Sequence, residues 1–293
     1  MAKRVVLIGH PVAHSLSGVL QQAAFDALGI DALYEPMDRP LIELPEAITA
    51  LRGEDYLGAN VTVPFKERVV PMVDRSTEEA HATGAVDTIT REGARLVGHN
   101  TDVLGFRPAL DALVGKQRMP KLAVVLGAGG GARAAVYGLI TAGFQHVIVF
   151  NRHLHRGEAL VRHFAKSAAH MELKAKPWHE SVLEAELSRT KVLINASSVG
   201  RTADETPIPG ELLPPDLLVL DLLYTPKETR LVREARGAGA AAAANGDVML
   251  IHQTAAAFNL WTGQAAPMEL LAERLEAARD EAVPAADAAA TDA

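Results

Sequence analysis

The most informative segment of this sequence is the glycine turn Gly127-Ala128-Gly129-Gly130-Gly131-Ala132. It follows Leu122-Ala123-Val124-Val125-Leu126, an apolar run typical of a buried parallel strand, and precedes residues with helical apolar spacing. The first glycine allows a tight turn, the second lets backbone N–H groups approach a pyrophosphate, and the small third residue lets helix and strand pack closely. The pattern predicts a Rossmann-type domain that binds a dinucleotide, rather than an ordinary glycine-rich connection.

The next predicted strand, residues 146–150, ends where such a domain reads the ribose of its cofactor, about 20 residues beyond the glycines. A carboxylate there would accept a hydrogen bond from the 2′-hydroxyl of NAD and would repel a phosphate. This chain has Asn151, Arg152 and His153 instead, followed by Arg156. Because arginine is a permanently charged fork that suits phosphate, we predict NADP as the cofactor. The alternative is that both arginines are solvated surface charges.

Composition sets the outer limits of the interpretation. The 293 residues allow one large domain or two ordinary ones, and 48% hydrophobic residues suffice for a packed core. A net charge of −7 without a basic stretch argues against a nucleic-acid partner. The lack of cysteine excludes disulfides, thiolate metal sites and thiol nucleophiles. No stretch reaches the roughly 18 continuous apolar residues of a membrane span, so we expect a cytoplasmic protein without a membrane partner.

The predicted elements divide the chain into two α/β units. Strands near residues 5–8 and 57–63 and a hairpin over residues 85–100 belong to a first unit without a nucleotide fingerprint. An apolar helix at 248–262 is expected to return to that unit, which leaves a ligand cleft between the units. We therefore predict a substrate-binding catalytic domain of residues 1–103 and 246–282, a doubly wound NADP-binding Rossmann domain of residues 104–245, and a disordered alanine-rich tail of residues 283–293.

Two serines stand beside the end of the first predicted strand. Ser15 and Ser17 are two residues apart, so both hydroxyls can point into one pocket and hold a carboxylate or sugar-like hydroxyls. The alternative for Ser17 is a plain helix N-cap, which the serine alone favours.

Two further strings bring a lysine and an aspartate to strand ends. Asn60 and Thr62 share one strand face, and Lys66 follows at the start of a helical stretch predicted for residues 65–70. Asp102 stands in Asn100-Thr101-Asp102 at the end of another strand. A lysine and an aspartate can form a proton-transfer pair, although each string alone favours a structural salt bridge.

Together these strings resemble the shikimate dehydrogenase family over most of the chain, from Gly9 to about Trp261. The resemblance implies NADP-linked interconversion of shikimate and 3-dehydroshikimate, run as a reduction in aromatic amino-acid biosynthesis. The motifs that carry it are Ser15-Leu16-Ser17, Asn60-Val61-Thr62-Val63-Pro64-Phe65-Lys66, Gly84-Ala85-Val86 with Thr88, Asn100-Thr101-Asp102, the glycine turn, Asn151-Arg152, Asn195-Ala196-Ser197-Ser198, Tyr224-Thr225-Pro226, Asn245-Gly246, Met249-Leu250 and Gln253.

The resemblance also implies roles for individual residues. Lys66 and Asp102 form the catalytic pair, in which Lys66 protonates the alkoxide left by hydride transfer and Asp102 orients it. Ser15 and Ser17 hold the substrate carboxylate. Further substrate contacts are expected from Asn60, Thr62, Asp87, Asp102, Tyr224 and Gln253. Cofactor contacts are expected from Gly127, Ala128, Gly129, Gly130, Gly131, Asn151, Arg152, His153, Arg156, Ser197, Leu222 and Gly246.

Three positions depart from the family pattern. Asp87 stands where the family usually has asparagine, Gly18 replaces a proline, and His153 replaces a threonine. Asp87 matters most, because an ionised carboxylate can accept but not donate a hydrogen bond. We expect it to forfeit one donated bond to the substrate, which leaves the identity of the substrate open.

Three other functions remain as alternatives. The chain could be a paralogue for quinate or aminoshikimate, a non-catalytic NADP sensor, or a methylenetetrahydrofolate dehydrogenase. Arg152 argues against an NAD-dependent quinate enzyme, the Lys66 and Asp102 pair against a sensor, and the serine string against the third. No metal is expected, since His153-x-His155 lacks an acidic partner. We expect a small-molecule substrate and a monomer or homodimer.

Overall fold

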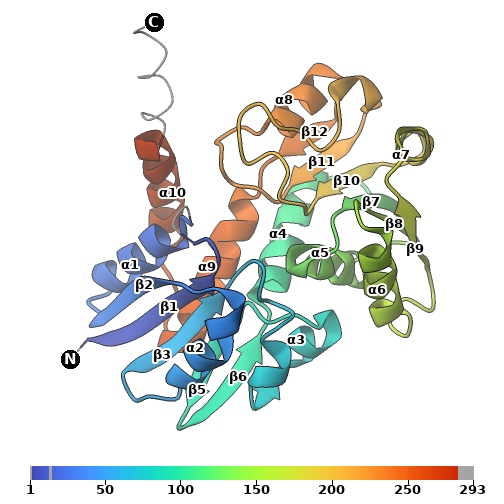
Figure 1. Cartoon of the computed structure of the whole chain (residues 1–293). Coiled ribbons are helices and arrows are strands. Elements are labelled where there is room, and N and C mark those ends of the chain that lie inside the picture. Colours follow the sequence, from blue (N-terminus) through green and yellow to red (C-terminus); the bar gives the residue numbers. More distant parts are fainter. Residues whose placement is uncertain (1, 13–14, 283–293) are drawn as a thin grey trace, which may run out of the picture.

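The computed structural model describes residues 2–12 and 15–282, so the predicted tail of residues 283–293 lies outside the described part. Figure 1 shows two lobes, with helices α4 (Thr101–Val114) and α9 (Asp247–Thr262) packed together between them. One six-stranded sheet contains β1 to β6 and the other contains β7 to β12. The two-domain α/β fold is confirmed, and the residue limits of the domains remain predictions.

The first sheet has the strand order β2-β1-β3-β5-β6-β4. Its elements are β1 (Lys3–Gly9), α1 (Ser17–Ala27), β2 (Ala32–Asp38), α2 (Leu44–Ala50), β3 (Tyr56–Val61), β4 (Arg75–Ser76), α3 (Glu78–Thr83), β5 (Thr88–Glu92) and β6 (Arg95–His99). β1 is parallel to β2 and β3, whereas β5 is antiparallel to β3 and β6. Side chains of β1 alternate between two cores, because Val6 and Ile8 pack with α2, while Val5 and Leu7 pack with α1 and α9.

The helix predicted for residues 65–70 is wrong. The chain forms successive turns there, followed by one 3₁₀ turn at Val70–Met72. The carbonyl oxygen of Lys66 accepts the N–H of Val86 at 2.8 Å, outside any helical ladder. Pro71 has no N–H to donate to the carbonyl of Glu67, so a helix cannot propagate. Lys66 is therefore held by a turn that is bonded to the segment before β5.

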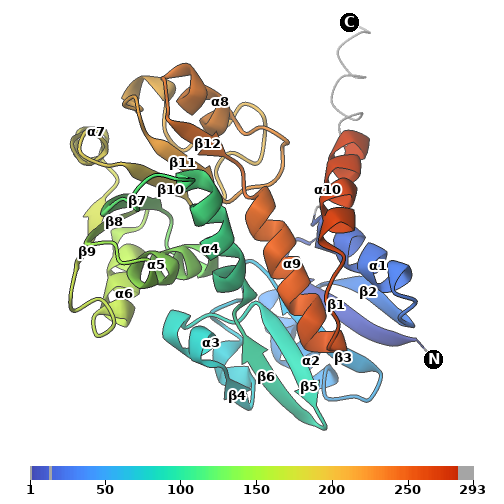
Figure 2. The ribbon, with the colours of Figure 1, turned by 180° about the vertical axis from the view of Figure 1, so that it is seen from behind.

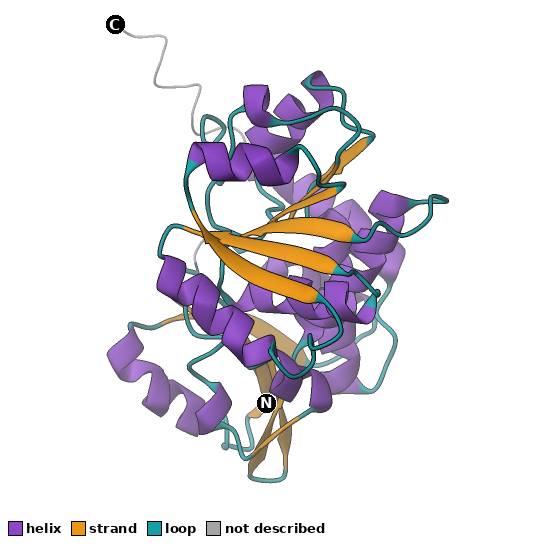
Figure 3. Ribbon diagram, turned by 90° about the vertical axis from the view of Figure 1, so that its right-hand side faces the viewer, coloured by secondary structure: helices purple, strands orange, loops and turns teal. Residues whose placement is uncertain are grey.

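The second sheet is parallel throughout, in the order β12-β11-β10-β7-β8-β9. Its elements are β7 (Leu122–Leu126), α5 (Gly130–Thr141), β8 (His146–Asn151), α6 (Leu154–Phe164), β9 (Glu172–Pro177), α7 (Glu180–Leu187), β10 (Val192–Asn195), β11 (Leu218–Asp221), α8 (Arg230–Gly237) and β12 (Ala242–Ala244). This is the 3-2-1-4-5-6 order of a Rossmann sheet. Figure 3 shows helices on both faces of the sheet. The side chain of Val125 packs with α4 and α5 on one face, and that of Val124 packs with α7 and α8 on the other.

The C-terminal helices return to the first lobe, as predicted. Figure 2 shows α9 running from the Rossmann lobe down to β5, and α10 (Met268–Ala282) beside α1. The indole N–H of Trp261 donates to the carbonyl of Ile89 at 3.0 Å, and the amide of Gln21 donates to the carbonyl of Thr254 at 3.0 Å. Both bonds are buried, and they fix α9 to β5 of the sheet and to α1 of the first lobe. Over residues 2–12 and 15–282, no helix has the length and apolar character needed to cross a bilayer.

Candidate active site

A cleft of about 630 Å³ runs between the two lobes. It passes the carboxyl ends of β7, β8 and β10, and the strand order reverses between β7 and β10, where ligands of doubly wound sheets bind. Of the predicted site residues, His153 alone does not line it. Those that do are Ser15, Ser17, Asn60, Thr62, Lys66, Asp87, Asp102, Gly127, Ala128, Gly129, Gly130, Gly131, Asn151, Arg152, Arg156, Ser197, Leu222, Tyr224, Gly246 and Gln253.

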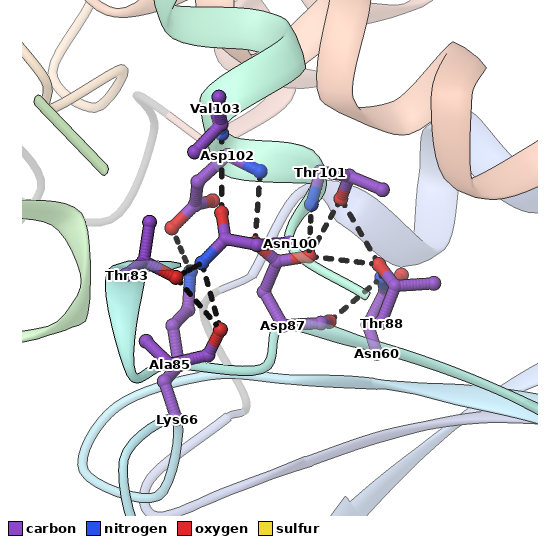
Figure 4. A network of polar contacts seen from close by, with 10 residues as sticks. All are labelled: Asn60, Lys66, Thr83, Ala85, Asp87, Thr88, Asn100, Thr101, Asp102 and Val103. Atoms are coloured by element: carbon purple, nitrogen blue, oxygen red, sulfur yellow. Dashed lines mark hydrogen bonds and ion pairs between the residues drawn. The ribbon is translucent and has the colours of Figure 1, made fainter. Parts of the chain in front are cut away.

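Lys66 and Asp102 form an ion pair in this cleft. The ammonium lies 2.5 Å from Oδ2 of Asp102, and their side chains are 15% and 4% exposed (Figure 4). Burial alone would lower the pKa of Lys66, but the charges of Asp102 and Asp87 outweigh it and raise that pKa above its ordinary value. The lysine is therefore a cation at neutral pH, with a proton available at the cleft.

The start of α4 is fixed by a capping asparagine. Asn100 is the N-cap residue, and its side-chain oxygen accepts the N–H of Val103 at 3.1 Å. Its amide group donates to the carbonyl of Ala85 at 2.9 Å and to the hydroxyl of Thr83 at 3.0 Å. These bonds satisfy an orphan donor of the helix and tie α4 to the turn that precedes β5. Asp102, in the first turn of α4, is thereby held opposite Lys66.

Asp87 lies beneath this same helix start and is 3% exposed. Its Oδ1 accepts the N–H and the hydroxyl of Thr101, at 2.8 and 2.7 Å, and the hydroxyl of Thr88 at 2.9 Å. Its Oδ2 accepts the N–H of Asp102 at 2.8 Å. The carboxylate predicted to face the substrate therefore has four donors within the protein.

Asn60 is oriented from two sides. The hydroxyl of Tyr34 donates to its Oδ1 at 2.9 Å, and its Nδ2 donates to the hydroxyl of Thr88 at 2.9 Å and to the carbonyl of Asp87 at 3.2 Å. Burial, with a smaller contribution from Tyr224, raises the pKa of Tyr34, so its hydroxyl stays a neutral donor. Both amide hydrogens of Asn60 are used, which leaves one lone pair on Oδ1 for a hydroxyl in the cleft.

The serine string has the geometry of a polar pocket rather than a helix cap. α1 begins at Ser17, its N-cap position is Leu16, and no side chain caps it, so the N-cap alternative for Ser17 is wrong. The Oγ of Ser15 accepts the N–H of Ser17 at 3.3 Å, and both serines line the cleft. Gln253, in α9, lines it as well, and its buried Oε1 finds no hydrogen-bond donor among the described residues. A buried acceptor of this kind needs a ligand or water.

The glycine turn joins β7 to α5, with Gly129 as the N-cap residue. Gly127 has φ of 106°, and a Cβ there would lie 2.8 Å from the carbonyl oxygen of Ala196, so only glycine fits. A Cβ on Gly129 would meet no atom of the described chain within 4 Å. The backbone at Gly129 is thus open to the cleft, which fits a pyrophosphate at the start of α5.

The far end of the cleft is cationic. Arg152 and Arg156 line it at the start of α6, and the amide of Asn151 donates to the carbonyl of His153 at 2.9 Å. His153 is the N-cap residue of α6, and its ring lies against that of His155, with centroids 5.8 Å apart. Two arginines beside the end of β8 fit a 2′-phosphate, whereas the histidine lies outside the cleft lining.

Two family models match the chain. Residues 7–89 match the shikimate dehydrogenase substrate binding domain, and residues 113–203 match shikimate / quinate 5-dehydrogenase. The shikimate dehydrogenase (NADP(+)) of Geobacter metallireducens is 40% identical over 93% of this chain and 95% of its own. The chain belongs to the shikimate dehydrogenase family.

Solved structures of the shikimate dehydrogenase family share the fold. A shikimate dehydrogenase in complex with NADP+ superposes with a TM-score of 0.84 at 32% identity, covering 94% of this chain and 96% of the other. Shikimate 5-dehydrogenase from Thermus thermophilus, in complex with NADP(H) and shikimate, gives a TM-score of 0.80 at 37% identity, covering 94% and 99%.

Several residues of this shikimate dehydrogenase site were missed by sequence reasoning. Tyr34 holds Asn60 from β2, two strands away in the sheet. Trp178 and Arg201 line the cleft from the segments after β9 and β10. The sequence held a signal for both residues, because each follows a strand whose carboxyl end faces the cleft. Arg201 follows the strand predicted at residues 192–195, and Trp178 follows β9, which was not predicted. Nothing in the sequence pairs Tyr34 with Asn60.

Two buried arginines connect the lobes around the site. Arg133, in α5, lies 3.0 Å from a carboxylate oxygen of Glu67 and donates to the carbonyl of Thr83 at 2.9 Å. Arg279, in α10, donates to the carbonyl of Tyr224 at 2.8 Å and forms a two-bond ion pair with Asp247. Arg279 thus joins the last helix to two segments that carry the Tyr224 and Gly246 wall of the cleft.

The described residues hold no group of three or more histidine, aspartate or glutamate side chains that could bind a metal ion. The rings of His153 and His155 lie against each other at the start of α6, but the two histidines are not part of any such group.

Proposed function

We propose that this chain catalyses the NADPH-dependent reduction of 3-dehydroshikimate to shikimate, in the biosynthesis of aromatic amino acids. The observation that carries the proposal is the buried ion pair of Lys66 and Asp102, 2.5 Å apart in the cleft that also contains the glycine turn. A relative named shikimate dehydrogenase (NADP(+)) is 40% identical over 93% of this chain. The pair supplies the proton that a ketone reduction requires.

Lys66 acts as the general acid of this reaction. Reduction of the ketone places negative charge on its oxygen, and the nearby ammonium stabilises that charge and then transfers a proton to it. The raised pKa of Lys66, for which the charges of Asp102 and Asp87 outweigh burial, keeps the proton on the nitrogen until the oxygen becomes basic. Asp102 orients the ammonium and hydrogen-bonds a neighbouring substrate hydroxyl.

The substrate is held by neutral polar groups of the first lobe and α9. Ser15 and Ser17 donate to its carboxylate, and the free acceptor of Gln253 takes a substrate hydroxyl. Asn60 offers the remaining lone pair of its Oδ1, and Thr62 and Tyr224 complete the pocket. The serine hydroxyls can donate hydrogen bonds to a carboxylate, whereas Asp87 and Asp102, when ionised, can only accept them.

NADPH fits the second lobe and supplies the hydride when bound. The open backbone of Gly129 and the N-terminus of α5 receive its pyrophosphate, and Arg152 and Arg156 receive its 2′-phosphate. Ser197, Leu222 and Gly246 line the cleft between the glycine turn and the substrate residues. We further propose that the enzyme works in the cytoplasm as a monomer or homodimer, which light scattering distinguishes.

One experiment tests the proposal directly. Purified protein is assayed by NADPH oxidation with 3-dehydroshikimate, with the dehydro acid of quinate, and with an amino analogue of the substrate. We expect turnover with 3-dehydroshikimate to exceed the others, and NADPH to exceed NADH. Preferred turnover of another acid would assign the chain to a paralogous reaction, and tight NADPH binding without turnover of any would favour the sensor.

A further inference from the structure

The side chain of Asp87 faces the N-terminus of α4 as much as it faces the cleft. Figure 4 shows its carboxylate beneath Thr101 and Asp102, the first two residues of the helix. Oδ1 and Oδ2 accept the backbone N–H groups of these residues, each at 2.8 Å. These are orphan donors of the helix, and a carboxylate is the group that the positive end of a helix dipole favours.

The hydrogen bond from the N–H of Asp102 to Asp87 connects Asp87 with the Lys66–Asp102 pair. Asp87 fixes the backbone nitrogen of Asp102, Asn100 fixes that of Val103, and the Asp102 side chain then meets Lys66 at 2.5 Å. The hydroxyls of Thr101 and Thr88 complete the shell of Oδ1. With four internal donors, Asp87 has the partners of a structural anion rather than those of a group that waits for a substrate hydroxyl.

We propose that Asp87 is a positioning residue of the Lys66–Asp102 pair: it anchors the first turn of α4 so that Asp102 meets Lys66. This inference rests on the proposed function and deepens it. It replaces the expectation that Asp87 is a poor substitute for a substrate-binding asparagine.

The charges around Asp87 agree with this role. The ionisable groups that act on it are Asp102, from α4, and Lys66, from the turn after β3. Burial and the charge of Asp102 raise the pKa of Asp87 to about 6, against the opposing effect of Lys66. Two carboxylates thus share one ammonium, and Asp87 takes up a proton as the pH falls through this value. A protonated Oδ2 is a poorer acceptor for the N–H of Asp102.

An asparagine cannot reproduce this arrangement at Asp87. Its single oxygen can accept from Thr101, but its NH₂ group would then face the N–H of Asp102, donor against donor. The variant Asp87→Asn keeps the size of the side chain and removes both the second acceptor and the charge. It therefore separates positioning of the pair from contact with the substrate.

We expect Asp87→Asn to lower kcat about tenfold or more, the effect of losing a charge-assisted hydrogen bond, with a smaller change in KM for 3-dehydroshikimate. The high-pH limb of kcat/KM moves to lower pH, because one of the charges that raise the pKa of Lys66 is gone. The matched control is Asp221→Asn. Asp221 is another buried carboxylate with a pKa of about 6, but it is not among the groups that shift the pKa of Lys66. We therefore expect the high-pH limb of kcat/KM to stay unshifted in this control variant. A raised KM with kcat and both limbs unchanged would overturn the proposal in favour of substrate contact.

A second measurement needs neither substrate nor variant. In the wild-type protein, the NMR signals of the Asp87 carboxyl carbon and the Asp102 amide are followed with pH. We expect them to titrate together with one midpoint, because the carboxylate and the amide share a hydrogen bond. An Asp102 amide that ignores the titration of Asp87 would overturn the proposal. If the enzyme failed to reduce 3-dehydroshikimate while the signals titrated together, the proposed function would fail and the positioning role would stand.

Discussion

Gly130 of the second lobe and Lys66 of the first lobe are in direct contact. A Cβ on Gly130 would lie 2.8 Å from Cδ of Lys66 and 2.9 Å from its Cβ, so the aliphatic stem of the lysine lies on the backbone of the glycine turn. The glycine has an ordinary helical environment otherwise, as the first residue of α5. The glycine turn therefore also forms one wall around the Lys66–Asp102 ion pair, and only glycine leaves room for the side chain of Lys66 at position 130.

The first prediction is that Gly130→Ala lowers kcat by about tenfold to 10²-fold, because the lysine stem must move and misplaces its ammonium. The control is Gly129→Ala, whose Cβ meets no described atom within 4 Å but intrudes on the space for the pyrophosphate. That variant should weaken NADPH binding and spare kcat. Steady-state kinetics with both substrates varied separates the two patterns, and equal effects of the two variants on kcat would contradict the contact.

Removal of the lysine itself gives the second prediction. Lys66→Ala should lower turnover about 10²- to 10⁴-fold, the usual contribution of a general acid. NADPH affinity, measured by fluorescence titration, should stay close to that of the wild type. Lys116→Ala removes an exposed lysine outside the cleft lining and serves as the control. Near-normal turnover of the Lys66 variant would remove this residue from catalysis.

The third prediction concerns the choice of cofactor. Arg152→Ala should weaken NADP binding roughly tenfold or more, since a charge-assisted hydrogen bond contributes about 1.5–3 kcal/mol, and should hardly affect NAD. Arg118→Ala, an exposed arginine outside the cleft lining, should change neither affinity. Calorimetric titration with both nucleotides decides it, and equal losses for NADP and NAD would exclude a role in binding the 2′-phosphate.

How much of the site could be predicted depends on how far apart in the sequence the interacting residues lie. The glycine turn was predicted from its strand and helix context, and the shared face of Asn60 and Thr62 from alternation. The pairing of Lys66 with Asp102 was predicted from the resemblance to the family, because each string alone favours a structural salt bridge. The bonds of Tyr34 to Asn60 and of Asp87 to Asp102 join segments that only the tertiary structure brings together. The sequence showed that Asp87 can only accept, but not which donors it accepts from.

The predicted helix after Thr62 failed for a related reason. Residues 65–70 have suitable local propensity, and no signal in this stretch shows that the carbonyl of Lys66 pairs with Val86 in a distant segment. Tertiary bonding overrides a weak local preference, and Pro71 removes the donor that would have extended the helix.

The fourth prediction is a pH dependence of stability that originates at Asp221. Burial raises its pKa to about 6, although the amide of Leu223, the hydroxyl of Thr229 and the side chain of Asn195 donate to it and oppose the shift. Between pH 3.8 and about pH 6, the carboxyl of Asp221 holds a proton in the folded protein but not in the unfolded chain, where its pKa is 3.8. The contribution of Asp221 to the free energy of unfolding is therefore present at low pH and is lost as the pH rises through about 6.

This contribution is measured as a difference between two proteins. The free energy of unfolding of the wild type minus that of Asp221→Asn should fall by about 3 kcal/mol between about pH 4 and about pH 7. Other carboxylates titrate in both proteins and cancel. Urea denaturation at several pH values gives the difference, and a flat one would show that Asp221 keeps its ordinary pKa.

The return of the last two helices to the first lobe has a consequence for the order in which the protein is made. The second lobe is continuous in sequence, from β7 to β12, and emerges from the ribosome ahead of α9 and α10. The sheet of the first lobe emerges earlier, yet its face with Val5 and Leu7 is covered by residues of α9 and α10, such as Phe258 and Leu271. Domains usually mature from the N-terminus during synthesis. Here the Rossmann lobe can fold first, and the lobe that starts the chain becomes complete only after the final helix, with its Arg279, has been released.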